Sequence, residues 1–285
     1  MKLGRLILTH RQELILPIKD FYLTGGRTNF LVIAYNRLSV DATKFKEADN
    51  FKLMPYFGKE LGGSAGGHQY FVWKEVAKSF PHIDAWVIHD YDLQAKPTDR
   101  EIFSHLNPNE YGCIGMPFPI WQEGMTKSIT ANIFPFLRHF VSSDLPKNER
   151  HKRMEELLVK NFPIMHQGVP TIMTGYADII AVLREHLLFF DQPSINNFES
   201  TGNEQIPATV LNYYKIKPVD LRKSFSCSIS LDNTIYIPFN NKFDFSHPVK
   251  FWPGINKPSL LLRIKKTIKK LLRKFGPAIS YPKFS

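Results

Sequence analysis

The sequence predicts an α/β fold in which a mainly parallel sheet is flanked by helices. Short, continuous apolar runs such as FLVIAY (30–35) and AWVI (85–88) are typical of strands that helices cover on both faces. Stretches with helical periodicity separate these runs, and such alternation favours a parallel sheet. The composition, 43% hydrophobic and 22% charged, fits a globular protein with a large core.

The expected elements follow from the same patterns, taken in chain order. Strands are expected at residues 5–9, 30–35, 85–88, 111–116 and 234–238. Helices are expected at residues 13–22, 68–80, 129–141, 152–160 and 203–214. Residues 165–188 are expected to form a turn, a short strand and then a helix.

The cysteines and the hydropathy of the sequence indicate in which compartment the protein is expected. The two cysteines, Cys113 and Cys227, lie in no CxxC or Cys/His cluster, which argues against a structural zinc site and a disulfide scaffold. A reducing, cytoplasmic compartment is therefore expected. No apolar run approaches the roughly 18 residues of a spanning helix, so the body of the protein is expected to be soluble.

The net charge of +11 is concentrated in one tail. Nine basic residues and no acidic ones follow residue 250, so the preceding body is nearly neutral and nucleic-acid binding is disfavoured. We expect a globular domain at 1–258 and, at 259–285, a basic amphipathic helix that associates with the inner face of a membrane. Alternatively, this helix docks on the protein's own core, or its basic face binds nucleic acid. Its apolar residues recur at helical steps: Leu261, Ile264, Ile268, Leu271, Leu272 and Phe275.

Two aspartates directly follow the expected strand at 85–88. Open α/β sheets bind ligands beyond the carboxyl ends of their strands, and Asp90 and Asp92 would both reach that edge. Carboxylate oxygens suit Mn²⁺ or Mg²⁺, which leave coordination positions open for substrate phosphates. The pair therefore predicts a site at which a divalent metal ion binds the diphosphate of a nucleotide. The alternative is a solvated turn whose Asp side chains cap backbone amides.

The segment GGSAGGHQYFVWKEVAKSFPHIDAWVIHDYD (62–92) resembles the GT-A glycosyltransferases, in which a glycine-rich stretch and a helix precede a strand ending in Asp-x-Asp. The resemblance implies a Rossmann-like catalytic domain over 1–258. It implies that Asp90 faces the ribose or the metal, and that Asp92 binds the metal and the diphosphate. Asn36 and Arg37, after the second strand, would contact the base, although any charged loop would look the same.

The glycine-rich stretch at 62–67 would lie on the donor side, with His68 and Gln69 as contacts. It is not a P-loop, because no Gly-Lys-Ser/Thr follows. Its glycines would let a phosphate approach the backbone at the start of a helix. A flexible turn between two elements explains the stretch equally well.

The start of the helix expected at 203–214 carries the candidate base. An acidic residue there, Glu204, is by default a dipole or capping partner. The pattern is also similar to the helix start of inverting GT-A enzymes, where a carboxylate deprotonates the acceptor hydroxyl. Gln167 and Gly168 resemble the acceptor-side turn of the family.

A late segment loosely resembles the closing motif of some GT-A families. His247 would complete the metal shell, while Gly254, Lys257 and Pro258 would hold the diphosphate, with Lys250 as an alternative phosphate contact. The spacing departs from the tighter family motif, and a histidine beside a proline is also an ordinary loop residue.

The resemblance implies a hexosyltransferase-like enzyme in surface polysaccharide or glycolipid biosynthesis. It would use Mn²⁺ or Mg²⁺ to transfer a sugar from a UDP-sugar to a glycan or lipid-linked saccharide. Inversion follows if Glu204 is the base, and retention remains open if it is a cap. The alternatives are a sugar nucleotidyltransferase and a non-catalytic module that binds a membrane or nucleic acid.

Overall fold

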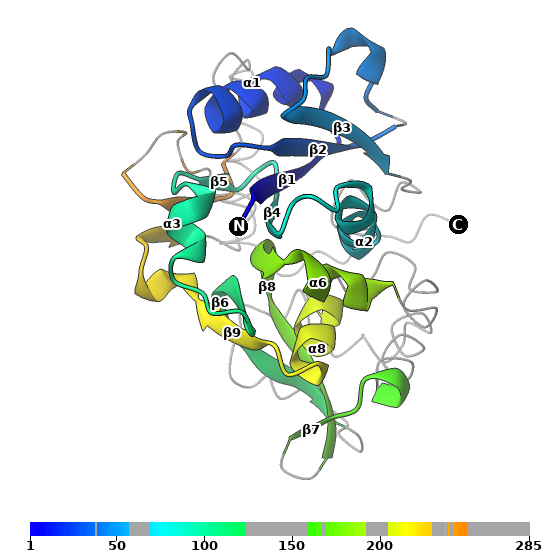
Figure 1. Ribbon diagram of the computed structural model, residues 1–285. Coiled ribbons are helices and arrows are strands. Elements are labelled where there is room, and N and C mark those ends of the chain that lie inside the picture. Colours follow the sequence, from blue (N-terminus) through cyan, green and yellow to red (C-terminus); the bar gives the residue numbers. More distant parts are fainter. Residues whose placement is uncertain are drawn as a thin grey trace, which may run out of the picture.

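The computed structural model describes residues 1–37, 39–56, 69–122, 159–166, 169–191, 205–229, 237, 239 and 242–249. Their central sheet has the strand order β3-β2-β1-β4-β8-β6-β9, and β7 pairs with the outer part of β8 (Figure 1). The expectation of a mainly parallel sheet flanked by helices is confirmed.

Most strands of the sheet point the same way. The first four are parallel: β1 (Leu3–Thr9), β2 (Leu31–Asn36), β3 (Phe51–Tyr56) and β4 (Ala85–Asp90). One strand, β8 (Val169–Leu183), runs antiparallel to its neighbours β4 and β6 (Glu110–Gln122). The edge strand β9 (Lys217–Asp220) is parallel to β6, and β7 (Ile164–His166) is antiparallel to β8.

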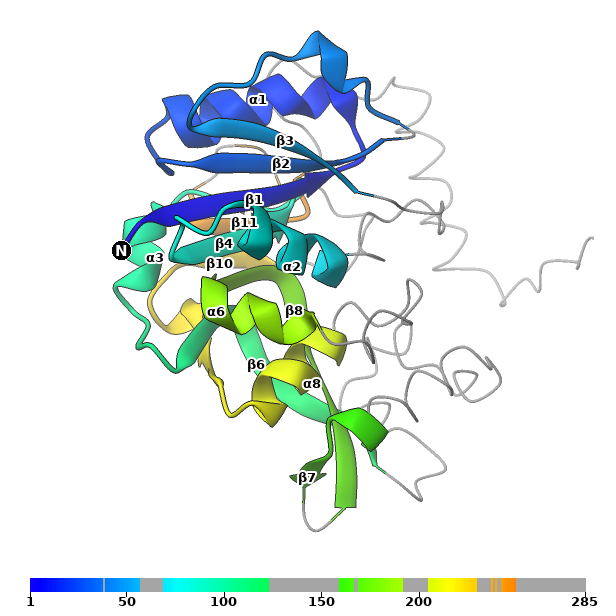
Figure 2. The ribbon, with the colours of Figure 1, turned by 45° about the vertical axis from the view of Figure 1, so that its right-hand side comes forward.

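Helices cover both faces of the sheet. One face carries α1 (Ile15–Lys19) with its flanking turns η1 (Gln12–Leu14) and η2 (Asp20–Thr24), and α3 (Asp99–Phe103). The other face carries α2 (Gln69–Ser79), α6 (Arg184–Leu187) with η7 (Leu188–Phe190), and α8 (Gln205–Tyr213), which Figure 2 shows gathered on one side. Short 3-10 turns, η3 (Ala42–Lys44) and η8 (Leu221–Lys223), follow β2 and β9.

Each inner strand contributes side chains to two cores. Along β1, Leu6 and Leu8 contact the core beneath α2 and α8, while Ile7 contacts the core beneath α1. This alternation explains why the strands have continuous apolar runs, because both faces are buried. Gly4 lets the Trp86 ring lie against β1, since a Cβ at that position would come within 2.9 Å of the indole.

The prediction for residues 165–188 is wrong for its helical part. Residues 169–183 form the long strand β8, and only four residues of α6 follow. The apolar run Ile179, Ile180, Ala181 and Val182 is buried between β4 and β6, where β-branched side chains pack well on a pleated surface. The elements expected at 129–141, 152–160, 234–238 and 259–285 lie wholly or mainly outside the described residues.

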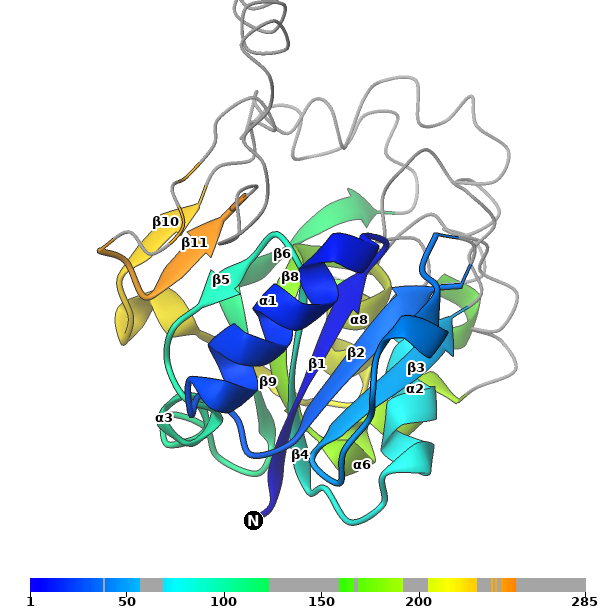
Figure 3. The same ribbon diagram turned by 90° about the horizontal axis from the view of Figure 1, so that it is seen from above.

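A second, smaller sheet brings a late part of the chain to the loop after β4. Its strand order is β10-β11-β5, formed by β10 (Cys227–Ile229), β11 (Phe245–His247) and β5 (Gln94–Ala95) (Figure 3). Backbone hydrogen bonds flank the β5–β11 pairing, from the Lys96 N–H to the Asp244 carbonyl (2.9 Å) and from the Val249 N–H to the Asp92 carbonyl (2.6 Å). This second sheet was not predicted from the sequence.

None of the described helices is both long enough and apolar enough to cross a bilayer.

Candidate functional site

The candidate site lies where the parallel strands end. In the registers of the sheet, Leu8 lies opposite Asp90, and Asn36 lies opposite Tyr56. The carboxyl ends of β1, β2, β3 and β4 therefore meet at one edge, visible in Figure 3. Ligands of open α/β sheets bind in the crevice beyond this edge.

Asp90 and Asp92 occupy the end of β4 and the turn that follows it. Asp90 is the last residue of the strand, and its carbonyl accepts a hydrogen bond from the Leu93 N–H (3.2 Å). The Tyr91 N–H donates to the Leu8 carbonyl of β1 (3.0 Å), so the turn is fastened to the neighbouring strand. The Asp92 side chain is 18% exposed, which leaves its carboxylate accessible at the edge.

His247 lies beside Asp92, although the two residues are far apart in the sequence. Its Nε2 is 3.5 Å from Asp92 Oδ1, and its side chain is 10% exposed. The pairing of β11 with β5 brings the histidine there, because β5 begins two residues after Asp92. The structure thus places together two of the three residues predicted to share a metal shell, and the third, Asp90, ends the adjoining strand.

The donor atoms of Asp92 and His247 fit a divalent ion. Neighbouring ligands of an octahedral Mg²⁺, with bonds of about 2.1 Å, lie roughly 3 Å apart, so a small side-chain adjustment would let both bind. The described residues contain no group of three or more His, Cys, Asp or Glu side chains arranged around a metal position. Such ions are commonly held by one or two carboxylates, with substrate phosphates and waters in the other positions.

A buried network supports the segment after Asp92. Arg5 on β1 is fully buried and forms an ion pair with Asp99, with Nη2 2.7 Å from Oδ1. The same guanidinium donates hydrogen bonds to the carbonyls of Ala95 (3.2 Å) and Pro97 (3.0 Å). Because one carboxylate and two backbone carbonyls converge on this cation, residues 95–99 are held in place relative to β1.

Tyr22 extends this network toward the turn. Its hydroxyl donates to the Leu93 carbonyl (3.3 Å) and accepts from the Ala95 N–H (3.1 Å), and the Arg5 guanidinium lies over its ring, 4.5 Å from the centroid. Neither Arg5 nor Tyr22 was predicted from the sequence to support the site. A charged side chain inside the apolar run at 5–9 was the available signal, since a buried arginine requires an acidic partner.

His89 supports Asp90 from within the core. Burial, reinforced by the nearby Arg5 charge, lowers the pKa of His89 to about 3. The imidazole is therefore neutral at physiological pH, and its Nδ1–H can donate to the Asp90 carbonyl, 2.8 Å away. His89 belongs to the scaffold of the site, because its ring is enclosed in the protein.

Three further residues of the edge were not predicted as site residues. His10 follows β1 and contacts the Tyr91 ring edge-on, with centroids 5.1 Å apart; burial lowers the pKa of His10, opposed by the charge of Asp92. Burial, with the charge of Asp90, raises the pKa of Tyr56 above its usual range, and burial with the charge of Asp92 does the same for Tyr91. Both phenols stay protonated and can donate hydrogen bonds.

The remaining predicted residues divide between the described chain and the rest. Asn36 ends β2 on the same edge, where its carbonyl accepts hydrogen bonds from the N–H groups of Ser39 (3.0 Å) and Val40 (3.1 Å), and Arg37 occupies the turn. Gln69 is the first residue of α2. The glycine-rich stretch at 62–67 and eight further predicted residues lie outside the described part: His68, Gln167, Gly168, Glu204, Lys250, Gly254, Lys257 and Pro258.

No protein family model and no curated protein matches the sequence. Among solved structures, a glycosyltransferase involved in the glycosylation of the major capsid of PBCV-1 is 12% identical, with a TM-score of 0.37 over 77% of this chain and 80% of that one. HddC from Yersinia pseudotuberculosis is 10% identical (TM-score 0.32, over 67% and 80%). The apo form of mouse xyloside xylosyltransferase 1 is 12% identical (TM-score 0.34, over 76% and 83%). These similarities, all at TM-scores below 0.5, do not assign the chain to a family.

Proposed function

We propose that the protein is a metal-dependent glycosyltransferase of the GT-A type that uses a nucleotide-sugar donor. The observation that supports this most is the 3.5 Å approach of His247 to Asp92 at the carboxyl edge of the sheet, with Asp90 two residues away. These three side chains come from the motifs that resemble the GT-A pattern, and their position is where such a sheet binds a nucleotide.

In this proposal Asp92 and His247 hold the ion at the donor diphosphate, and Asp90, at the end of β4, faces the metal or the ribose. A bound Mn²⁺ or Mg²⁺ stabilises the negative charge that grows on the diphosphate as the sugar leaves. An imidazole nitrogen among carboxylate oxygens favours Mn²⁺ over Mg²⁺, which prefers oxygen ligands. Arg5 and Tyr22 keep the carbonyls of residues 93–97 in place, so the two aspartates are oriented before the substrate binds.

The nucleotide would extend from the diphosphate across the ends of β1 and β2. Asn36 and Arg37 lie on this side, in line with a role at the base or the ribose. His68, Gln69, Lys250 and Lys257 complete the proposed donor contacts. A UDP-sugar is the proposed donor.

The proposed acceptor-binding side of the site is formed around α8. This helix is fastened to β8 through Thr209, whose hydroxyl donates to the Met173 carbonyl and accepts from the Met173 N–H, both at 3.1 Å. It is followed by β9, whose first residue pairs with the start of β6, so α8 begins toward the carboxyl edge. Glu204 directly precedes it in the sequence and is the proposed base, with Gln167 and Gly168 at the acceptor. Transfer would then invert the anomeric centre.

The basic segment 259–285 would hold this domain against an anionic membrane at the cytoplasmic face, where a glycan or a lipid-linked saccharide is extended. Surface polysaccharide or glycolipid synthesis is the proposed setting.

Turnover of nucleotide sugars tests the proposal. The protein is incubated with each common nucleotide sugar and Mn²⁺, and the release of nucleoside diphosphate is measured with and without EDTA. We expect release from one donor that EDTA abolishes, that Asp92→Asn removes, and that the exposed control Asp20→Asn preserves. Release of pyrophosphate from a nucleoside triphosphate and a sugar phosphate would instead identify a nucleotidyltransferase, and the absence of both activities would contradict the proposal.

A further inference from the structure

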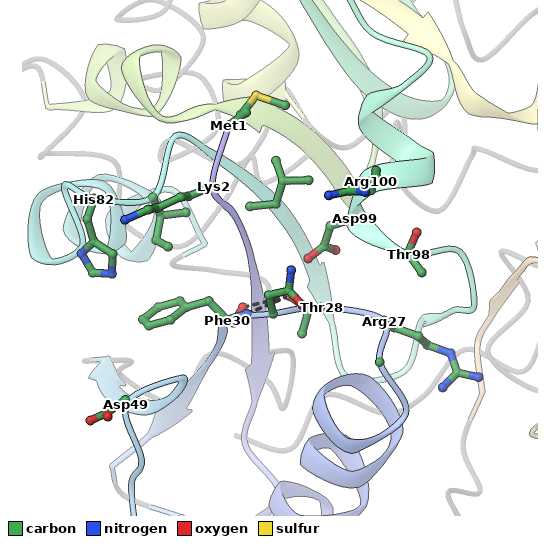
Figure 4. Close-up of a pocket in the computed structure, with 14 residues that line it drawn as sticks. Met1, Lys2, Arg27, Thr28, Phe30, Asp49, His82, Thr98, Asp99 and Arg100 are labelled. Carbon is green, nitrogen blue, oxygen red and sulfur yellow. Dashed lines mark hydrogen bonds between the residues drawn. The ribbon is translucent and has the colours of Figure 1, made fainter.

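A cavity of about 520 Å³ opens at the amino edge of the sheet, on the side opposite the candidate site (Figure 4). It lies at the start of β1, between the segments that lead into β2, β4 and α3. The seven residues of β1 separate it from the carboxyl edge by about 20 Å at ~3.3 Å per residue. A ligand there would occupy a site separate from the donor crevice, and the volume lies in the range typical of small-molecule pockets.

A carboxylate oxygen without a partner marks the polar side of this cavity. Asp99 is 3% exposed, and its Oδ1 accepts hydrogen bonds from the buried Arg5 guanidinium. Its Oδ2 is buried and has no hydrogen-bond partner among the described residues. A buried oxygen of this kind costs free energy unless a donor reaches it. Because Arg5 holds the carboxylate in one orientation, Oδ2 is pre-positioned to accept a hydrogen bond from a hydroxyl group of a ligand.

Charge and shape describe the rest of the ligand. Figure 4 shows Lys2 on one side of the hollow, with Asp99 and Arg100 on the opposite side. Lys2 and Arg100 are exposed and form no ion pair with any described residue, whereas Leu3 and Ile83 supply an apolar wall. Two cations, together with one carboxylate oxygen that can accept a hydrogen bond, suit a ligand that carries both an anionic group and hydroxyl groups.

The other charged side chains at the cavity do not reverse its preference for an anionic ligand. The Arg27 guanidinium lies over the Phe21 ring, 3.8 Å from the centroid, and donates to the Phe21 carbonyl, so it points away from the hollow. Asp49 is exposed, and Figure 4 shows it beyond the Phe30 ring. The charge of Asp99 is compensated by Arg5.

From these contacts we propose that the cavity is a second binding site, for a phosphorylated sugar. A sugar hydroxyl donates to Asp99 Oδ2, the phosphate contacts the neighbouring Arg100, and the apolar face of the ring rests against Leu3 and Ile83. Lys2, on the opposite side, adds positive charge to the cavity. The ligand contacts proposed here and those of the donor site involve different residues, although Asp99 also supports the turn after β4 through Arg5.

Calorimetric titration with glucose 6-phosphate tests the proposal on four full-length proteins. We expect binding to the wild-type protein and to Asp92→Asn, which alters only the donor site. We expect at least a tenfold weaker affinity for Arg100→Glu, and an unchanged affinity for Lys223→Glu, an exposed control with the same change of charge. Inorganic phosphate should bind more weakly than the sugar phosphate, because it lacks the hydroxyl that reaches Asp99.

Absence of binding to the wild-type protein would overturn the proposal. So would equal affinity in Arg100→Glu and Lys223→Glu, or loss of binding in Asp92→Asn, which would place the sugar phosphate at the donor crevice. Equal affinity for inorganic phosphate would contradict the hydroxyl contact. A failure of the proposed glycosyltransferase activity would leave these outcomes unaffected, because the readout is binding.

Discussion

The guanidinium of Arg5 and the carboxylate of Asp99 form a buried ion pair, 2.7 Å apart, that connects the first strand to the start of α3. Asp99 follows the Asp-x-Asp turn closely in the chain, and the hydrogen bonds of Arg5 to Ala95 and Pro97 act on the intervening segment. The pair therefore bears both on stability and on the orientation of the candidate site.

Replacing Arg5 with Met should destabilise the protein strongly. The substitution leaves Asp99 buried without its cation and also removes two backbone contacts. Breaking one side of a buried pair costs about 3–5 kcal/mol, measurable as the free energy of unfolding in urea. The control is Lys44→Met, which breaks an exposed ion pair with Asp41 and should change the free energy of unfolding far less. Equal losses in the two variants would show that the Arg5 pair has no special role.

His89 should make the stability depend on pH. Its folded-state pKa of about 3 lies below its unfolded value of about 6.5, so the unfolded chain takes up the proton first as the pH falls. The stability contributed by neutral His89 is therefore complete above pH 6.5 and declines toward pH 3. Between pH 7 and pH 5 the linkage amounts to about 2 kcal/mol. Urea unfolding at the two pH values should show this loss in the wild type and a clearly smaller one in His89→Gln; matching losses would contradict the assignment.

His247→Gln should weaken the response to manganese while the fold is retained. Glutamine keeps a polar amide beside Asp92, but it is a poorer metal ligand than imidazole. We expect the Mn²⁺ concentration that half-saturates UDP binding to rise about tenfold or more, equivalent to ~1.4 kcal/mol or more. The exposed His105→Gln serves as the control. If both variants keep the wild-type manganese dependence, His247 lies beside Asp92 without binding the metal.

Glu204→Gln tests the proposed base separately from donor binding. Loss of a general base lowers turnover by about 10²–10⁴-fold, whereas an amide at a helix start preserves much of a capping role. With donor saturating, we expect this loss in turnover with UDP affinity unchanged. The matched control is Glu185→Gln, whose side chain is 70% exposed. Near-normal turnover of Glu204→Gln would exclude it as the base.

The fold class could be predicted from the sequence because most strands have a recognisable local pattern of apolar residues. Continuous apolar runs indicated β1, β2 and β4, and a helical pattern closed by Pro81 indicated α2. The error at β8 arose because a fully buried strand and a buried helix both have continuous apolar residues. Only the pairing of β8 with β4 and β6 decides between them, and that pairing is not local.

The candidate site could be predicted only in part, for the same reason. Asp90 and Asp92 follow a recognisable strand, so their position at the edge was predictable. The approach of His247 to Asp92 depends on the pairing of β11 with β5. These strands have only three and two residues, which is too short for a recognisable hydrophobic pattern. The contacts of Arg5 beneath the turn likewise depend on tertiary structure, as do those of Tyr22.

Calorimetric titration of UDP in the presence of Mn²⁺ is the most direct test of the proposed metal site. Wild-type protein should bind UDP only with the metal. Asp92→Asn should lose this metal-supported binding, while the exposed control Asp20→Asn retains it. If Asp92→Asn binds UDP with manganese as tightly as the wild type does, Asp92 and His247 do not hold the ion, and the central claim is wrong.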